Sequence, residues 1–404
     1  MNYELRLGNS YKIGQELPWI TDIKRRFNHF YLIGKTGVGK STLMENMAKY
    51  DAEAGYSIFY IDPKGTHAVR LYNTLPKYRI IYVSKNNFDL VINPLRKDSL
   101  SLNDCISEFV QIMNIVVSLT SKNPEATQLH RQLLTNAILA FPEELRELYY
   151  LFRFLTYENE RKAFLKNQKL PDWLREFWTE FDEREGRYHY HREWVQASER
   201  VSSRLNNFIS DDRIKRLITG KNTLSFRDII ENGKIFLLNT AGMSFEQRAY
   251  ITNLIVYGIF SYMEHEREKD GKPFFCYIDE FEICVSNLFS NLLALARSSK
   301  VGFTFAHHAF DQLPQNIVNS IKGIADNFVI YRCGEDEAKS MSSIFGIEAR
   351  NFMNLPDYEA WARLKTDNII FTAFKPFEAS EELPSFKEKP NEGFSFLRDD
   401  WFSC

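Results

Sequence analysis

The sequence predicts an α/β fold in which a mainly parallel sheet carries helices on both faces and is interrupted by a large all-helical insertion. Short apolar runs alternate with stretches of helical periodicity before residue 99 and again after residue 225, a pattern typical of parallel strands joined by crossover helices. Between these two positions strand-like runs and glycines are scarce, and helical periodicity dominates. A glycine-rich run, 34–41, lies between the first core strand and the first core helix.

The chain of 404 residues is long enough for two or three cores, or for one core with a large insertion. We expect a short N-terminal segment at 1–28, a core built from 29–98 and 226–376, the all-helical insertion at 99–225, and a C-terminal tail at 377–404. The N-terminal segment is too short to form a domain, and the tail shows little periodicity.

Each core element follows from a local pattern. Strands are expected where short apolar runs are bounded by turn-forming residues, and helices where apolar residues recur every three or four positions. The expected strands are 29–33, 57–61, 79–83, 234–239, 274–278, 301–306 and 328–332, with a closing hairpin of 360–364 and 369–374. The expected core helices are 41–54, which stops at Gly55, and 245–266.

Composition places the chain among ordinary globular proteins, with 44% hydrophobic and 26% charged residues. The net charge of −2 gives no broad excess of Lys and Arg, which nucleic-acid binders often carry, although it leaves room for a local basic patch. No apolar run approaches the ~18 residues that cross a bilayer. The five cysteines form no CxxC pair. We therefore expect a cytoplasmic protein with reduced thiols and no transmembrane segment of its own.

The run 34–41 reads Gly-Lys-Thr-Gly-Val-Gly-Lys-Ser and matches the phosphate-binding P-loop pattern G-x-x-x-x-G-K-[ST], in the strand–loop–helix context that the motif needs. Gly37 and Gly39 allow the backbone to curl so that its N–H groups point at phosphates. Lys40 is expected to reach the β- and γ-phosphates of ATP, and Ser41 to offer its hydroxyl to Mg²⁺. A chance glycine turn is the alternative. The predicted nucleotide-binding residues are Gly34, Lys35, Thr36, Gly37, Val38, Gly39, Lys40, Ser41 and Thr42.

Asp279 and Glu280 end the apolar strand at 274–278. We expect Asp279 to hold Mg²⁺, directly or through water, and Glu280 to polarise a water for attack on the γ-phosphate. An ordinary acidic strand end is the alternative, but the upstream P-loop favours the functional interpretation. The pair indicates hydrolysis rather than transfer to a small acceptor. The chain also lacks the Asn-Lys-x-Asp guanine signature and the Leu-Ser-Gly-Gly-Gln sequence of transporter cassettes.

Two further candidate catalytic residues, Arg297 and His308, lie downstream. Arg297 ends a predicted helix, where it could reach the γ-phosphate of a neighbouring subunit or simply be a solvated helix-end arginine. His308 follows His307 at the end of a predicted strand, close to where ligands bind in parallel sheets. It could sense the γ-phosphate or have no role.

A basic stretch within the insertion, 184–216, interleaves arginines with Tyr188, Tyr190 and Trp194. Cations and aromatic rings together suit phosphate contact and base stacking, whereas a charge run is more often only a solvated face. The stretch is therefore a candidate contact for nucleic acid.

Beside the P-loop, several specific runs follow one another along residues 30–374. They are Ile61-Asp62-Pro63-Lys64-Gly65, Ile92-Asn93-Pro94-Leu95, Gly233-Lys234-Ile235-Phe236-Leu237-Leu238-Asn239, Tyr277-Ile278-Asp279-Glu280-Phe281, Ala294-Leu295-Ala296-Arg297-Ser298, Ala306-His307-His308, Asp311-Gln312-Leu313, Asn327-Phe328-Val329-Ile330-Tyr331-Arg332, Asp336-Glu337-Ala338 and Leu355-Pro356-Asp357-Tyr358-Glu359-Ala360. In this order they resemble the HerA–FtsK group of ring-forming DNA-pumping ATPases, and within it the conjugative type IV secretion coupling proteins of the TraG/TraD type.

The resemblance implies a RecA-like motor core with an all-helical insertion, ATP and Mg²⁺ as cofactors, DNA as a partner, and a homo-oligomer, which in the family is a hexamer. Arg297 matches the place of the family's trans-acting arginine finger. His308 stands where the family usually has a glutamine that senses the γ-phosphate, and a histidine can also donate a hydrogen bond. Coupling proteins usually carry membrane helices, whereas no transmembrane segment is expected in this sequence. We therefore expect this chain to pair with a separate membrane, relaxosome or secretion partner, or to work free in the cytoplasm.

The expected function is an ATP-hydrolysing DNA translocase that acts as a ring in conjugative or mobile-element DNA transfer. One alternative is a viral genome-packaging ATPase, which uses the same kind of motor. The other is a nucleotide-switched ATPase subunit of a DNA repair or defence complex, which moves nothing. The Asp279-Glu280 pair and Arg297 favour turnover, and therefore the translocase.

Overall fold

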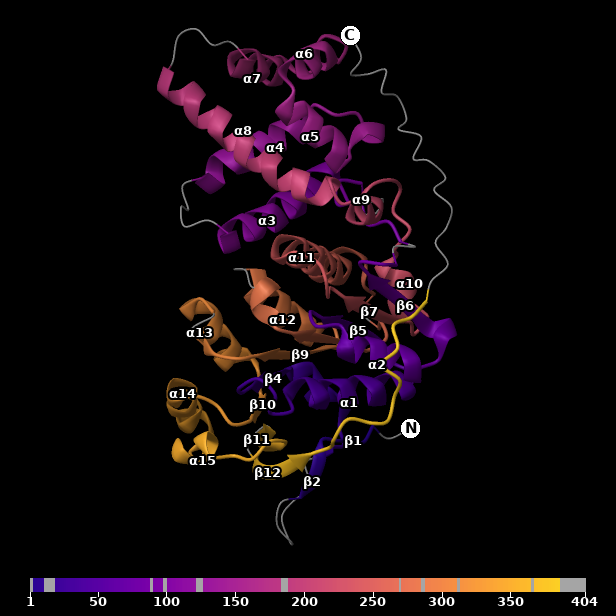
Figure 1. Cartoon of the computed structure of the whole chain (residues 1–404), viewed down its shortest axis with the longest axis vertical. Coiled ribbons are helices and arrows are strands. Elements are labelled where there is room, and N and C mark those ends of the chain that lie inside the picture. The colour runs from indigo at the N-terminus through magenta and orange to yellow at the C-terminus, as the bar shows by residue number, and fades with distance from the viewer. Residues whose placement is uncertain are drawn as a thin grey trace. The chain divides into compact units, whose positions relative to one another are not determined.

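The computed structural model describes residues 3–10, 19–87, 90–96, 100–120, 126–182, 188–268, 270–284, 288–310, 313–364 and 367–385. They divide into two compact units (Figure 1). The core unit falls within Met1–Lys85, Ser225–Met243 and Gly258–Pro384, and the helical unit within Asn86–Leu224 and Ser244–Tyr257. The domain boundaries drawn from the sequence stay a prediction. Outside the described residues lie Asp311, Gln312, Arg184, Arg187 and the predicted tail beyond residue 385.

The core unit is built on a ten-stranded sheet with the order β2-β12-β11-β10-β4-β9-β8-β5-β7-β6. The seven consecutive strands from β10 to β6 run parallel, and β11, β12 and β2 pair antiparallel at the other edge. Their bounds are β2 Gly8–Ser10, β4 Phe30–Ile33, β5 Ser57–Asp62, β6 Ile80–Ser84, β7 Ile235–Asn239, β8 Phe274–Asp279, β9 Val301–His307, β10 Asn327–Ile330, β11 Glu359–Leu364 and β12 Asp367–Ala373. The predicted α/β fold is confirmed, and each predicted core strand is found to within two residues.

Burial follows the layers of the core unit. Strands β4, β5, β8 and β9 consist entirely of buried residues, as expected for parallel strands with helices on both faces. In β11 every second residue is buried, which is typical of an edge hairpin with one face covered. The helices of this unit are α1 Lys40–Glu53, α2 Thr66–Thr74, α10 Phe226–Glu231, α12 Leu288–Ser298, α13 Gln315–Ile324, α14 Glu335–Phe345 and α15 Arg350–Met353.

The N-terminal segment contributes more to the core unit than its length suggested. Strand β2 extends the sheet, and a short strand β1 (Leu5–Arg6) pairs with β3 (Trp19–Ile20). Arg26, from a basic run in the sequence, is fully buried, and its Nη2 lies 2.7 Å from Asp51 Oδ2. The Tyr3 hydroxyl donates to Asp51 Oδ1 at 2.7 Å. The two charges pair because an isolated charge is too costly to bury.

The helical unit packs around large apolar side chains. Its helices are α3 Leu102–Thr120, α4 Ala126–Leu139, α5 Leu148–Thr156, α6 Glu158–Lys166, α7 Asp172–Asp182, α8 Tyr188–Ile209 and α9 Asp212–Ile218. The rings of Phe154 and Trp178 meet edge to face at 4.7 Å between centroids. A helix is present at 245–266 as predicted: α11 (Phe245–Ser261) continues as a π-helical turn, Tyr262–Glu266. It was expected in the core, but most of α11 groups with the helical unit.

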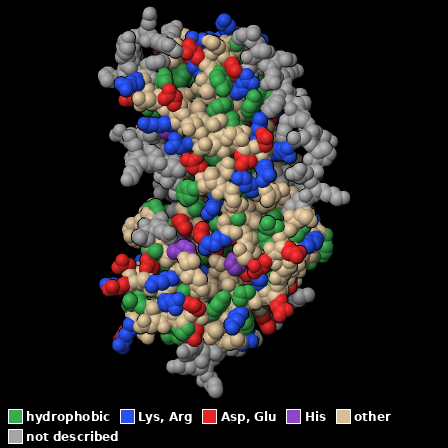
Figure 2. Space-filling model, viewed as in Figure 1, with side chains coloured by type: hydrophobic (Ala, Val, Ile, Leu, Met, Phe, Trp, Pro, Cys, Tyr) green, Lys and Arg blue, Asp and Glu red, His purple; other side chains and the backbone are tan. Residues whose placement is uncertain are grey.

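Charges of both signs are interspersed on the face that Figure 2 shows, in keeping with the net charge of −2. Across the described ranges, we find no helix that combines the length and the apolar character required to span a bilayer.

Candidate functional site

The P-loop connects the carboxyl end of β4 to the amino end of α1. Gly37 and Gly39 have φ angles of 81° and 111°, in the left-handed region that favours glycine. A Cβ on Gly37 would meet open space, whereas one on Gly39 would lie 2.9 Å from the Tyr358 ring. The loop therefore has the curled backbone that a P-loop requires, directly before a helix of 14 residues.

Neighbouring strand ends hold this loop in place. The backbone N–H of Lys35 donates to the carbonyl of Arg332 at 2.8 Å, and the N–H of Tyr358 donates to the carbonyl of Val38 at 2.9 Å. Arg332 follows β10, and Tyr358 precedes β11. The loop is thus fixed by backbone contacts from the segment after β10, which lies beside β4, and from the segment before β11, which lies beside β10. Such fixing favours binding without a large rearrangement.

Lys40 is buried in the loop. Its Nζ donates to the carbonyl oxygens of Gly34 at 2.6 Å and Lys35 at 2.8 Å, and lies 3.2 Å from His308 Nδ1. Burial lowers the pKa of Lys40 to about 8, against the attraction of Asp279. The amine would gain an anionic partner if phosphate oxygens entered the loop.

The two acidic residues reach the P-loop from β8. Ser41 Oγ donates to Asp279 Oδ2 at 2.6 Å, which joins the first turn of α1 to the end of β8. A hydroxyl and a carboxylate are the oxygen donors that Mg²⁺ takes beside water and nucleotide phosphates, so these two side chains fit a magnesium ion. Glu280 follows with φ 49°, and its N–H donates to Asp279 Oδ1 at 3.0 Å.

The carboxylate of Glu280 lies between two basic side chains. Its Oε1 is 3.8 Å from His308 Nε2 and 3.0 Å from Lys64 Nζ. His308 and Lys64 together lower the pKa of Glu280 to about 2, so the group is ionised at neutral pH. The sequence singled out Lys64 only within a family motif. Lys64 stands just after β5 and Glu280 just after β8, so both follow the carboxyl ends of parallel strands. This shared position is the signal in the sequence that could have identified Lys64.

The two histidines at the end of β9 differ. His307 is buried, with the Tyr31 hydroxyl 2.8 Å from its Nδ1, and burial lowers its pKa to about 3. His308, one residue further, bridges the gap between Lys40 and Glu280. His308, which was predicted as a candidate catalytic residue, is therefore the histidine that contacts the P-loop.

Arg297 lies elsewhere in the core unit. It stands in the last turn of α12, with 56% of its side chain exposed, and its Nη2 is 4.0 Å from Asp326 Oδ2. This turn precedes the start of β9, whereas the P-loop follows the end of β4, which runs parallel to β9. The start of β9 and the end of β4 are therefore separated by about the length of β9, roughly 20 Å. Arg297 is therefore not brought to the P-loop of its own chain.

The basic stretch of the insertion is divided by the structure. Arg192 and Arg200 of α8 are exposed, but Trp194 is buried in the helical unit, so the predicted use of its ring for base stacking is wrong. Because α8 is amphipathic, Trp194 lies on the buried face of this helix, together with Ala197 and Val201. The side chains of Tyr188 and Tyr190 lie outside the described residues.

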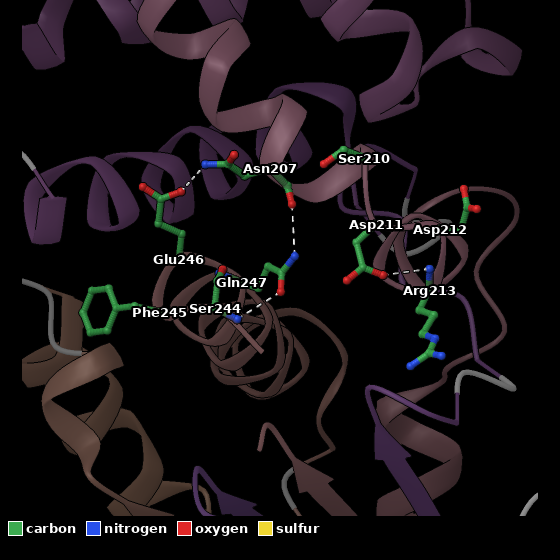
Figure 3. Close-up of a pocket in the computed structure, with 9 residues that line it drawn as sticks. All are labelled: Asn207, Ser210, Asp211, Asp212, Arg213, Ser244, Phe245, Glu246 and Gln247. Atoms are coloured by element: carbon green, nitrogen blue, oxygen red, sulfur yellow. Dashed lines mark hydrogen bonds between the residues drawn. The ribbon is translucent and has the colours of Figure 1, made fainter. Parts of the chain in front are cut away.

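A pocket in the helical unit lies where the end of α8, the start of α9 and the start of α11 meet (Figure 3). Its polar groups are largely bonded to one another: Asn207 Nδ2 donates to Glu246, and Gln247 Nε2 donates to the carbonyl of Asn207 at 3.1 Å. It is lined by Asn207, Ser210, Asp211, Asp212, Arg213, Ser244, Phe245, Glu246 and Gln247. None of the predicted nucleotide-binding or catalytic residues lines this pocket, although its residues from Asn207 to Arg213 belong to the basic stretch 184–216.

With this geometry in view, comparison with known proteins is decisive for the family. The family model described as "Helicase HerA, central domain" matches residues 5–259, more than half of the 404 residues. The chain belongs to this HerA family. The resemblance seen in the motifs is thereby confirmed. A search of curated protein sequences finds no match.

Solved structures of two proteins, TrwB and VirB4, match nearly the whole chain. The bacterial conjugative coupling protein TrwBΔN70 has a TM-score of 0.68 at 14% identity, over 96% of this chain and 97% of that chain. VirB4 of Thermoanaerobacter pseudethanolicus has a TM-score of 0.61 at 13% identity, over 92% and 96%. TrwB has also been solved with ADP and Mg²⁺, at a TM-score of 0.68 and 14% identity over 95% of this chain and 97% of that chain. At these identities the likeness establishes a shared RecA-like P-loop fold.

Proposed function

We propose that this HerA-family protein hydrolyses ATP with Mg²⁺ in order to move DNA. The observation that supports the proposal most directly is the 2.6 Å hydrogen bond between Ser41 and Asp279, which joins the phosphate-binding loop to the acidic strand end. Next to it in the chain, Lys40 begins α1 and Glu280 follows β8, and His308, after β9, lies between their side chains. Such a set is what phosphoryl transfer to water needs, because its catalysis depends on positioning and charge stabilisation.

Each side chain has a distinct part in the proposed reaction. The loop N–H groups and Lys40 bind the phosphates, and Ser41 and Asp279 hold Mg²⁺, which when bound neutralises phosphate charge. Glu280, with its pKa near 2, is a weak base, so it orients and polarises the attacking water. His308 contacts the space between Lys40 and Glu280 and is suited to donate to the γ-phosphate.

We further propose that the active form is a ring, with the hexamer of the family as the expected size. Arg297 supports this proposal because it is exposed and lies just before the start of β9, at the opposite ends of the parallel strands from its own P-loop. In a head-to-tail assembly, the side of one subunit where its parallel strands begin can face the nucleotide of the next subunit. An arginine placed there would stabilise charge in the neighbour's transition state.

DNA transfer in conjugation or a mobile element is the preferred biological role. TrwB is described as a conjugative coupling protein, and the match extends over nearly the full length of both chains. Viral genome packaging uses the same motor chemistry and remains the second candidate. A nucleotide-switched repair or defence subunit ranks lower, because Glu280 is ionised and lies beside His308, which contacts Lys40 of the P-loop.

The test is ATP hydrolysis measured with and without DNA. We expect hydrolysis to depend on Mg²⁺ and to rise when DNA is added, and Lys40→Ala to abolish it. Hydrolysis that is fast without DNA and unchanged by it would contradict the translocase. An inactive protein that still binds ATP would favour the nucleotide-switched subunit.

A further inference from the structure

A lysine in the loop after strand β5 lies against the carboxylate proposed to polarise water. Lys64 Nζ is 3.0 Å from Glu280 Oε1, with 49% of the lysine side chain and 17% of the glutamate side chain exposed. An ion pair with this much solvent contact adds little to folding stability. The presence of this ion pair beyond the carboxyl ends of β5 and β8 therefore calls for an explanation other than folding stability.

The loop that carries Lys64 is fixed on both sides. Asp62 is fully buried, and its carboxylate accepts hydrogen bonds from the N–H of Lys64 at 3.0 Å and the N–H of Ala68 at 2.9 Å. Gly65 has φ 82°, and a Cβ there would collide with the side chain of Asn239 at the end of β7. The backbone at Lys64 is consequently held in one place relative to the sheet.

Glu280 needs support from outside its own backbone. Its φ of 49° is a conformation that a residue other than glycine keeps only when its surroundings hold it. The strand before it, β8, lies between β5 and β9. One basic side chain comes from each of these neighbours, Lys64 after β5 and His308 after β9. The carboxylate is thus held from both sides of its strand.

We propose that Lys64 is a positioning residue for ATP hydrolysis, which holds the Glu280 carboxylate in the orientation that directs the attacking water. The inference rests on the proposed function of Glu280. Lys64 acts through this carboxylate, whereas Lys40 is the lysine that binds phosphates. The distinction matters because a lysine that bound the γ-phosphate itself would set nucleotide affinity, and a positioning lysine sets the rate of the chemical step.

A double-mutant cycle tests this role. Single-turnover ATP hydrolysis is measured with DNA for the wild type, Lys64→Met, Glu280→Gln and the double variant, and affinity is measured with a non-hydrolysable ATP analogue. We expect Lys64→Met to slow hydrolysis about tenfold with affinity unchanged, because a misplaced group costs rate. In the Glu280→Gln background, Lys64→Met should have no further effect. Lys64→Arg should restore most of the rate.

The controls keep the outcomes separate. Lys339→Met removes a comparable Lys–Glu pair, Lys339–Glu335 at 2.6 Å on α14, and should leave the rate unchanged. A wild-type rate in Lys64→Met overturns the inference, as does a tenfold loss of affinity or an equal further loss in the Glu280→Gln background. If Lys64→Met does not fold, Lys64→Gln takes its place. A wild type that hydrolyses nothing defeats the proposed function as well, whereas an active wild type with an inactive Glu280→Gln and a fully active Lys64→Met defeats only this inference.

Discussion

Nucleotide binding should take up a proton, and the amount follows from the environment of Lys40. Burial lowers the pKa of its amine to about 8 in the absence of nucleotide. Phosphate oxygens at the amine would favour the charged form and raise this pKa to its ordinary value or above. The protein with nucleotide therefore binds more protons than the protein without it at alkaline pH.

The expected uptake can be worked out for each pH. With a pKa of about 8 before binding, about a tenth of a proton is taken up at pH 7, about half at pH 8 and about nine tenths at pH 9. Affinity should accordingly fall by up to about tenfold for each pH unit above 8. The terminal phosphate of the nucleotide contributes little here, because phosphate monoesters lose their second proton at about pH 6.

Titration calorimetry in buffers of different ionisation enthalpy measures this uptake, with a non-hydrolysable ATP analogue and Mg²⁺. Lys40→Arg is the matched control, since its guanidinium is charged throughout this range and should bind without uptake. Binding by the wild type with no uptake between pH 7.5 and 9 would refute the reasoning. Equal uptake by Lys40→Arg would assign the proton to another group.

Three further predictions concern turnover, assembly and stability. Glu280→Gln should leave nucleotide affinity intact and lower the hydrolysis rate at least about a hundredfold, because the amide no longer polarises the water; equal loss of affinity would indicate a binding role instead. Arg297→Ala should inactivate the assembled protein, yet regain part of its activity when mixed with Lys40→Ala subunits; a mixture without activity would point to a role within one chain. Arg26→Met should lower the free energy of unfolding by about 3–5 kcal/mol in denaturant titration, because it leaves Asp51 buried without its charged partner, and an unchanged midpoint would contradict this account.

Local patterns in the sequence were sufficient for the α/β fold, for every strand of the large sheet except β2, and for helix α1. The P-loop was especially clear, because its glycine spacing, its preceding strand and its following helix all lie within one short stretch of chain. Asp279 and Glu280 were also recognisable, since an apolar run that ends in two acids is a local feature. In each case the physical determinant is backbone conformation or side-chain periodicity, which neighbouring residues set.

The tertiary structure decided which distant strand ends meet. Only the order of the sheet places β8 between β5 and β9, and so brings Lys64 and His308 to opposite sides of Glu280. It also buried the charged side chain of Arg26 and the ring of Trp194, which the sequence had offered as a candidate for base stacking. Neighbouring residues cannot specify such outcomes, because strand order and burial depend on packing between segments that lie hundreds of residues apart.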